Sequence, residues 1–249
     1  MNLTNLAGFI IVLICAALMG VFWYLNRGRP YRGLRPIPAF GRLRRAIGMA
    51  VEDGSRVHVS LGSASLTGAN SASALIGLAM LERVAQLGSA SDRPPVVTAG
   101  DPSLAILSQD ELRSTYRAAN LSEEYNPQQG RLAGVTPFSY AAGTMPVFFD
   151  EQVSSNIVIG NFGPEAGLIA DAAEQTHACL LAGSDALTGQ AVLFAAAQDP
   201  LIGEELFAGG AYLQAGSMHT ASLHTQDALR WGLAGLMILG AILKLIGVV

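Results

Sequence analysis

The sequence of 249 residues contains only two cysteines, Cys15 and Cys179, and both lie within apolar segments. Their surroundings are typical of small buried hydrophobic side chains rather than of reactive thiols. Cys15 lies inside a long terminal apolar run and Cys179 inside a predicted intracellular domain, so the sequence predicts no disulfide between them.

The sequence also lacks the short motifs that identify catalytic or nucleotide-binding sites. The turn at 62–68, with the sequence GSASLTG, follows the first predicted strand but matches neither G-x-G-x-x-G nor G-x-x-x-x-G-K-[ST]. The sequence as a whole contains no G-x-S-x-G elbow and no cluster of metal-ligating residues. The sequence therefore predicts no catalytic residue, no metal and no cofactor, and it favours a non-enzymatic protein.

Charged residues are few, at 14% of the chain, and apolar residues make up 51%. The apolar excess is concentrated in two terminal runs, Leu6–Leu25 and Leu229–Val249. About twenty apolar residues cross the roughly 30 Å hydrocarbon core of a bilayer, so both runs are predicted transmembrane helices. A signal peptide is the alternative for the first run, but no basic residue precedes it. A buried core helix is the alternative for the second, in which Lys244 would need a partner.

Seven arginines and no acidic residue lie between Asn26 and Ala46. The positive-inside rule places this arm in the cytoplasm, so both termini are predicted to lie outside and the intervening domain inside. The expected partners of the arm are anionic lipid headgroups or the acidic face of a neighbouring copy, and no nucleic acid is expected. The lipid- or subunit-contacting candidates are Arg27, Arg29, Arg32, Arg35, Arg42, Arg44 and Arg45.

The pattern along the chain predicts five parts. They are a first span at 1–25, a basic proline-containing arm with a short helix at 26–55, an α/β domain at 56–204, a helical connector at 205–228 and a second span at 229–249. Within the connector, the pair Gly209-Gly210 predicts a bend.

Short apolar runs alternate with longer helical stretches between the two spans. The predicted strands are Val57–Leu61, Pro95–Ala99, Arg131–Val135, Asn156–Gly160, Ala178–Ala182 and Pro200–Ile202. The predicted helices are Ala39–Asp53, Ser71–Leu87, Leu104–Ala119, Tyr140–Val153, Pro164–Gln175 and Leu187–Gln198. This alternation predicts an α/β fold, a Rossmann-like parallel sheet with helices on both faces.

Most predicted strands end in glycine followed by a polar residue, which places polar groups along one edge of the sheet. The candidate ligand-binding residues of this crevice are Gly62, Ser63, Ser65, Gly100, Asp101, Gly160, Asn161, Gly183, Ser184 and Asp185. Two alternatives stay open. The turns and both aspartates can serve only as helix caps, or Asp101 and Asp185 can form a carboxylate pair for acid–base or Mg²⁺ chemistry.

Four segments carry a resemblance to a known family: VEDGSRVHVSLG at 51–62, SDRPP at 91–95, TAGDP at 98–102 and IGEELF at 202–207. Together they resemble an uncharacterised family of bacterial membrane proteins from Chloroflexi-type genomes, known only as a domain of unknown function. The resemblance implies the same order of anchor, α/β domain and anchor in a bacterial inner membrane. It implies no activity and no site residues.

Charge separates the arm from the rest of the chain. Between Glu52 and Asp227 lie nineteen acidic and six basic residues, a formal charge of −13, whereas the arm carries +7. This contrast favours a self-assembling structural or scaffold component, with a homo-oligomer, anionic lipid and other membrane proteins as expected partners. The alternative is a membrane-tethered domain that binds or senses a small anionic or nucleotide-like ligand at the sheet edge.

Overall fold

A computed structural model describes residues 3–27, 34–88, 91 and 93–246 of the chain. The chain divides into two compact units. One unit comprises the terminal segments 1–34 and 216–249, and the other comprises residues 35–215.

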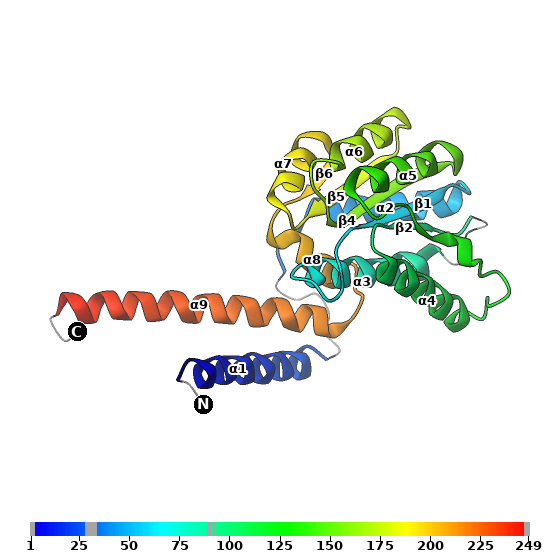
Figure 1. Cartoon of the computed structure of the whole chain (residues 1–249). Helices are drawn as coiled ribbons and strands as arrows, with labels where there is room; N and C mark the ends of the chain where they lie inside the picture. Colours follow the sequence, from blue (N-terminus) through cyan, green and yellow to red (C-terminus); the bar gives the residue numbers. More distant parts are fainter. Residues whose placement is uncertain (1–2, 28–33, 89–90, 92, 247–249) are drawn as a thin grey trace. The chain divides into compact units, whose positions relative to one another are not determined.

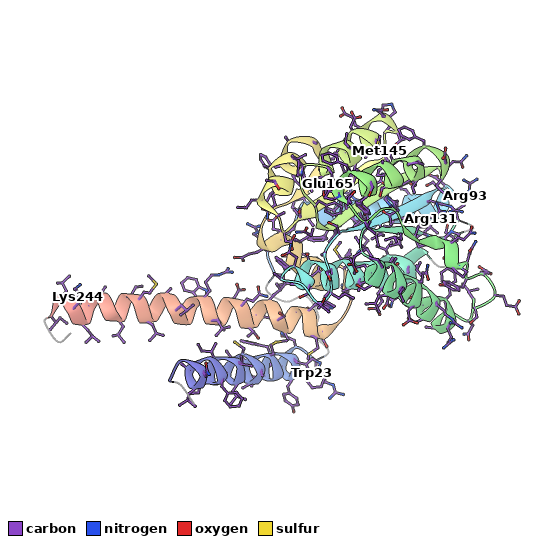
Figure 2. The ribbon with its side chains drawn as sticks, viewed as in Figure 1. Trp23, Arg93, Arg131, Met145, Glu165 and Lys244 are labelled. Atoms are coloured by element: carbon purple, nitrogen blue, oxygen red, sulfur yellow. The ribbon has the colours of Figure 1, made fainter. Side chains whose placement is uncertain are left out.

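The terminal unit consists of two helices, α1 (Leu3–Asn26) and α9 (Ser217–Leu245), which pack side by side (Figure 1). They run antiparallel, since the ring of Phe22 near the end of α1 lies 5.8 Å from that of His224 near the start of α9. Figure 2 shows Lys244 near the opposite end of α9. Both helices are long and apolar enough to cross a membrane, which confirms the predicted pair of terminal apolar helices.

The second unit is built on a six-stranded parallel sheet with the strand order β3-β2-β1-β4-β5-β6. The strands are β1 (Arg56–Gly62), β2 (Val96–Ala99), β3 (Gly130–Leu132), β4 (Val153–Asn161), β5 (Cys179–Ser184) and β6 (Asp199–Leu201). Each overlaps one predicted strand, and this order is that of Rossmann domains. The predicted fold class, a Rossmann-like parallel sheet, is therefore confirmed.

Two layers of helices cover the sheet (Figure 1). The helices are α2 (Pro38–Glu52), α3 (Ser71–Gly88), α4 (Pro102–Ala118), α5 (Pro137–Asp150), α6 (Ala166–Gln175), α7 (Leu187–Ala196) and α8 (Glu204–Tyr212), with a short 3-10 helix η1 (Pro127–Gln129). Helices α2, α3 and α4 form one layer, hereafter the α2–α4 layer, and α5, α6 and α7 form the α5–α7 layer. Helix α8 packs against α3 and β6.

Alternate residues of β1 face opposite layers, as the two-residue period of a strand requires. Leu61 faces α3, since its Cδ2 would lie 3.0 Å from a Cβ added at Gly77. His58 faces α5, because its ring lies 5.1 Å from the ring of Phe148. Both sides of β1 are buried, which explains why the strand reads as an almost continuous apolar run.

Helix α2 belongs to the sheet-covering structure although it lies in the predicted arm. Pro38 opens the helix, where the missing amide proton costs nothing. One face of the helix is buried, at the helical spacing of Ala39, Phe40, Leu43, Ala46, Ile47 and Ala50. The compact unit is thus longer than the predicted domain 56–204. It also includes α2, which precedes that range in the sequence, and α8, which extends beyond its end.

The bend predicted at Gly209-Gly210 was wrong, because both glycines lie inside α8. Gly209 instead allows close packing, since a Cβ there would lie 2.5 Å from Sδ of Met80 in α3. The chain turns between α8 and α9, where Gln214 has a φ of 62°. Helix α9 then continues from Ser217 through the predicted connector into the apolar run.

Candidate functional site

The predicted crevice residues lie at or just beyond the carboxyl ends of four neighbouring strands, β2, β1, β4 and β5. Gly62 ends β1 and Asn161 ends β4, and the chain leaves these two strands toward opposite layers. Such a switch point is where doubly wound sheets bind ligands. The structure therefore brings the candidates to one sheet edge, while their role in binding stays a prediction.

The strand ends at this switch point approach very closely. A Cβ added at Gly62 would lie 2.5 Å from Asn161 O, and one at Gly160 would lie 2.0 Å from Leu61 O. Gly62 also has a φ of 70°, which favours glycine. Glycine is thus required here by the contact between two backbones, which is a structural reason independent of any ligand.

Three backbone amides of this edge already donate hydrogen bonds within the protein. Ser63 N–H donates to Asn161 O at 3.1 Å, Gly100 N–H to Gly62 O at 2.8 Å and Asp185 N–H to Gly160 O at 3.2 Å. Anion sites at strand-to-helix turns depend on unpaired amides of this kind. An anionic ligand would need these backbone N–H donors. The protein already uses them to join its own strand ends.

The two aspartates of the edge have different local roles. Asp101 caps α4, because its carboxylate accepts hydrogen bonds from the amides of Ser103 at 2.9 Å and Leu104 at 3.3 Å. Asp185 caps no helix and accepts from the Asn161 side-chain amide at 2.6 Å. The capping interpretation is confirmed for Asp101 and was wrong for Asp185.

Asp101 and Asp185 do not form a carboxylate pair. They follow β2 and β5, which are separated by β1 and β4. Three inter-strand steps of about 4.8 Å place the two strand ends roughly 14 Å apart. A shared proton or a shared Mg²⁺ would need the carboxylates much closer, so the alternative that paired them was wrong.

The remaining hydroxyls of the edge also have local partners. The hydroxyl of Ser184 donates to Phe162 O at 2.9 Å and accepts from Phe162 N–H at 3.0 Å. Ser65 lies in the turn after β1, where its hydroxyl is 3.4 Å from that of Thr67. Gly183 packs beneath, since a Cβ there would lie 3.0 Å from Leu201 Cβ.

Below this edge, a buried polar network lies between the sheet and α5. His58 Nδ1 is 3.0 Å from Asn156 Oδ1 and its Nε2 is 2.9 Å from the Thr98 hydroxyl. Tyr140 of α5 continues the network, with its hydroxyl 2.5 Å from that of Ser60 and 3.2 Å from that of Thr98. Burial lowers the pKa of His58 to about 4, so its imidazole is neutral at pH 7.

The arm arginines divide into four groups. Arg35 pairs with Glu205, and Arg42 pairs with Asp199 at 2.7 and 3.0 Å from Nε to the two carboxylate oxygens. Their guanidiniums thus bind carboxylates of their own domain, and contact with lipid or a neighbouring copy stays a prediction for these two as well. Asp199 is only 2% exposed and needs this cation.

Two other arm arginines, Arg44 and Arg45, are exposed on α2 and have no ion pair within the described part of the chain. Arg27 lies in the terminal unit, with its guanidinium 5.4 Å from the ring centre of Trp23. Arg29 and Arg32 lie outside the described residues. Lipid or subunit contact therefore stays a prediction for these five arginines.

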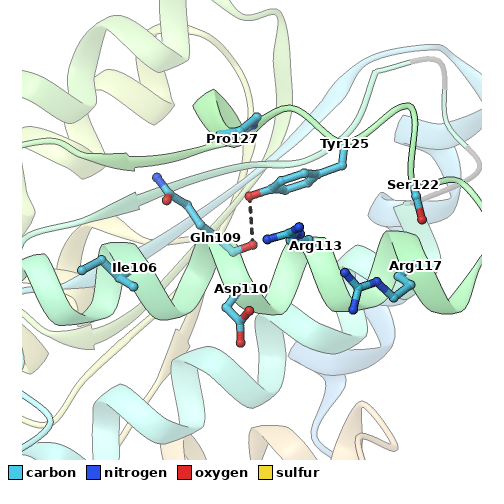
Figure 3. Close-up of a pocket in the computed structure, with 8 residues that line it drawn as sticks. All are labelled: Ile106, Gln109, Asp110, Arg113, Arg117, Ser122, Tyr125 and Pro127. Carbon is cyan, nitrogen blue, oxygen red and sulfur yellow. Dashed lines mark hydrogen bonds between the residues drawn. The ribbon is translucent and has the colours of Figure 1, made fainter.

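A groove of about 630 Å³, which the sequence analysis missed, lies between α4 and the segment 122–127 (Figure 3). The hydroxyl of Tyr125 donates to Gln109 O at 3.0 Å and holds this segment over α4. The lining residues are Ile106, Gln109, Asp110, Arg113, Arg117, Ser122, Tyr125 and Pro127. The i, i+4 spacing of Arg113 and Arg117 is the sequence signal that could have identified it.

The outer surface of the α5–α7 layer was also missed. Only three of its 34 helical residues are charged, at Asp150, Asp171 and Glu174. Large apolar side chains are exposed there instead, at Phe138, Phe149, Leu168, Leu187 and Phe194. On α7, Leu187, Ala191 and Phe194 follow one exposed helical stripe.

The described residues contain no group of three or more His, Cys, Asp or Glu side chains placed to hold a metal ion.

A family model described as "Domain of unknown function (DUF6754)" matches residues 1–249. No curated protein and no solved structure matches the chain.

Proposed function

Because the chain belongs to the DUF6754 family, a domain of unknown function, we propose a function from its own residues. We propose that it is a membrane-anchored, non-enzymatic α/β protein that self-assembles as a structural component of a bacterial membrane complex. In this proposal the α5–α7 layers of two copies pack against each other.

One observation carries the proposal: the outer surface of the α5–α7 layer is apolar and almost free of charge. Leu187 is 81% exposed, Phe194 67% and Phe138 64%, all on helices that cover the same face of the sheet. Large apolar side chains exposed on neighbouring helices mark a candidate interaction site. Two-fold symmetry is the commonest symmetry of protein oligomers and places a surface against itself, which suits a surface with few charged groups.

The terminal helices support the membrane part of the proposal. Each contains a run that is long and apolar enough to cross a membrane, and they form an antiparallel pair, as expected for an even number of spans. The seven arginines that follow the first helix favour a cytoplasmic α/β domain with both termini outside. The membrane is proposed to be the inner membrane of a bacterium, of the Chloroflexi type, from the sequence resemblance alone.

Anchors at both ends restrict how two copies meet. Copies in one bilayer share one orientation, so they can be related only by rotation about an axis along the membrane normal. Free Arg44 and Arg45 are proposed to contact anionic lipid headgroups or another membrane protein. Arg35 and Arg42 are left out of this role because they pair with Glu205 and Asp199.

The alternative, a sensor that binds an anionic or nucleotide-like ligand above the sheet edge, has weaker support. The edge carries glycine and polar residues in the right place, but the amides of Ser63, Gly100 and Asp185 are already used. A ligand there would have to displace hydrogen bonds between strand ends. The exposed apolar layer has no role in this alternative.

The test is the mass of the full-length protein in detergent and in lipid nanodiscs, measured by native mass spectrometry. Self-assembly predicts two or more copies per particle, with no other polypeptide. A single copy at micromolar concentration in both environments would contradict the proposal.

A further inference from the structure

The groove between α4 and the segment 122–127 contains two arginines without a partner. Neither the Arg113 nor the Arg117 guanidinium forms a hydrogen bond or ion pair within the described part of the chain. Several other arginines of the same unit do bind carboxylates, among them Arg35, Arg42, Arg56 and Arg131. Two unpaired cations therefore line one concave surface.

The positions of these arginines suit one ligand with several oxygens. Residues four apart on a helix place their Cβ atoms about 5–6 Å apart, so both guanidiniums can reach one diphosphate-sized group. Guanidiniums bind phosphate through paired N–H donors, and the exposed hydroxyl of Ser122 adds a donor on the facing segment. A carboxylate, with two oxygens, would leave more of these donors unused.

The rest of the lining defines what else the ligand can carry. Asp110 brings one negative charge, but in Figure 3 its carboxylate points away from Tyr125, whereas the Arg113 guanidinium lies beside the Tyr125 ring. Ile106 and Pro127 supply apolar surface. The volume of about 630 Å³ is in the range of small-molecule sites, roughly 300–1,000 Å³.

We propose that this groove binds a soluble phosphorylated small molecule, whose phosphates contact Arg113, Arg117 and Ser122 and whose organic part lies against Ile106 and Pro127. The proposal is independent of self-assembly, because the groove belongs to the α2–α4 layer and the proposed subunit contact to the α5–α7 layer. Either proposal can fail without the other.

The experiment is calorimetric titration of the full-length protein in detergent with inorganic pyrophosphate. We expect saturable binding at one site per chain, weakened at least tenfold in the double variant Arg113→Gln/Arg117→Gln. The matched control is Arg44→Gln/Arg45→Gln, which removes two exposed arginines of the same layer outside the groove. It should bind within twofold of the parent.

Both arginines are exposed and unpaired, so the double variant should keep the melting temperature of the parent. Absence of saturable binding by the parent would overturn the proposal, as would equal loss in the control or retained binding in the double variant. A second titration uses nanodiscs that contain phosphatidic acid. Arginine-dependent binding of the lipid without binding of pyrophosphate would overturn the assignment to a soluble ligand.

Discussion

The two helical layers of the α/β unit are opposite in character. The α2–α4 layer has ten charged residues among 50, and its inner side meets apolar residues of β1 such as Val59 and Leu61. The α5–α7 layer has three charged residues among 34, and α5 covers the buried polar residues His58, Ser60 and Thr98. The α2–α4 layer thus carries most of the charge on its outside, whereas α5 adds a polar network to a largely apolar inner face and belongs to a layer with few charges outside.

This difference assigns the layers different roles. A charged outer surface is well hydrated and needs no partner to cover it. In the α2–α4 layer, this surface also contains the groove with Arg113 and Arg117. An apolar outer surface is unfavourable in water, so the α5–α7 layer is the one expected to be covered. The network beneath α5 fixes this helix by specific hydrogen bonds rather than by apolar contact alone.

The largest expected effect comes from charging the apolar layer. The double variant Leu187→Glu/Phe194→Glu should dissociate the assembly completely, because it would bury two carboxylates per copy in the contact. Both side chains are exposed in the single chain, so folding should be unaffected. Native mass spectrometry of the full-length variant measures the outcome.

The matched control charges the other layer. Leu75 of α3 is 57% exposed, a fraction comparable with the 67% of Phe194. Leu75→Glu should leave the assembly intact. Dissociation by Leu75→Glu, or survival of the assembly in the double variant, would contradict the contrast between the layers.

The second effect concerns how tightly the layers pack on the sheet. A Cβ at Gly189 of α7 would lie 2.0 Å from Phe162 O, so Gly189→Ala should destabilise the fold by roughly 3 kcal/mol through overpacking. Gly48 of α2 has open space, so Gly48→Ala should be neutral or slightly stabilising. Thermal unfolding of the two variants tests this, and equal melting temperatures would refute it.

The third effect is the pH dependence that arises beneath α5. The pKa of His58 is lowered to about 4 in the folded protein, below its ordinary 6.5, so only the unfolded chain binds the proton between these values. Stability from His58 is complete above pH 6.5 and is lost as the pH falls toward 4, by about 3 kcal/mol in total.

His58→Gln serves as the variant, because glutamine is polar and carries no proton that titrates in this range. The melting temperature of the parent should fall more steeply than that of the variant between pH 6.5 and 4.5. Parallel curves would show that His58 does not contribute.

The smallest effect is expected from the free arm arginines. Arg44→Gln/Arg45→Gln should lower the amount of co-purified anionic lipid, since each arginine near a membrane surface contributes on the order of 1 kcal/mol. The assembly itself should persist. Arg113→Gln/Arg117→Gln is the control and should leave the lipid content unchanged. Loss of the assembly in the arm variant would instead show that these arginines bridge copies.

The sequence was sufficient for the fold because its elements have local signals. Buried parallel strands read as short apolar runs, so even the three-residue β6 was located to within one residue. Asp101 with Pro102 likewise predicted a helix cap from adjacent residues alone. The Gly209-Gly210 pair misled, because its glycines serve packing against Met80, a contact distant in sequence.

The candidate site was predictable only in part, for the same reason. The edge of the sheet followed from the strand pattern, but the hydrogen bonds that join its strand ends link residues from separate strands, as Ser63 and Asn161 do. The pairing of Arg42 with Asp199 spans 157 positions. The sequence pattern placed Arg35 and Arg42 in the arm. Only their tertiary contacts with Glu205 and Asp199 show that both arginines belong to the compact α/β unit.

The central claim is that the apolar α5–α7 layer is covered by another copy of the chain. The most direct test is an electron cryo-microscopy structure of the full-length protein in lipid nanodiscs, resolved well enough to place side chains on α7. The account predicts the α5–α7 layer of a second copy against Leu187 and Phe194. A structure in which this layer faces solvent, or in which copies meet only through other surfaces, would contradict it.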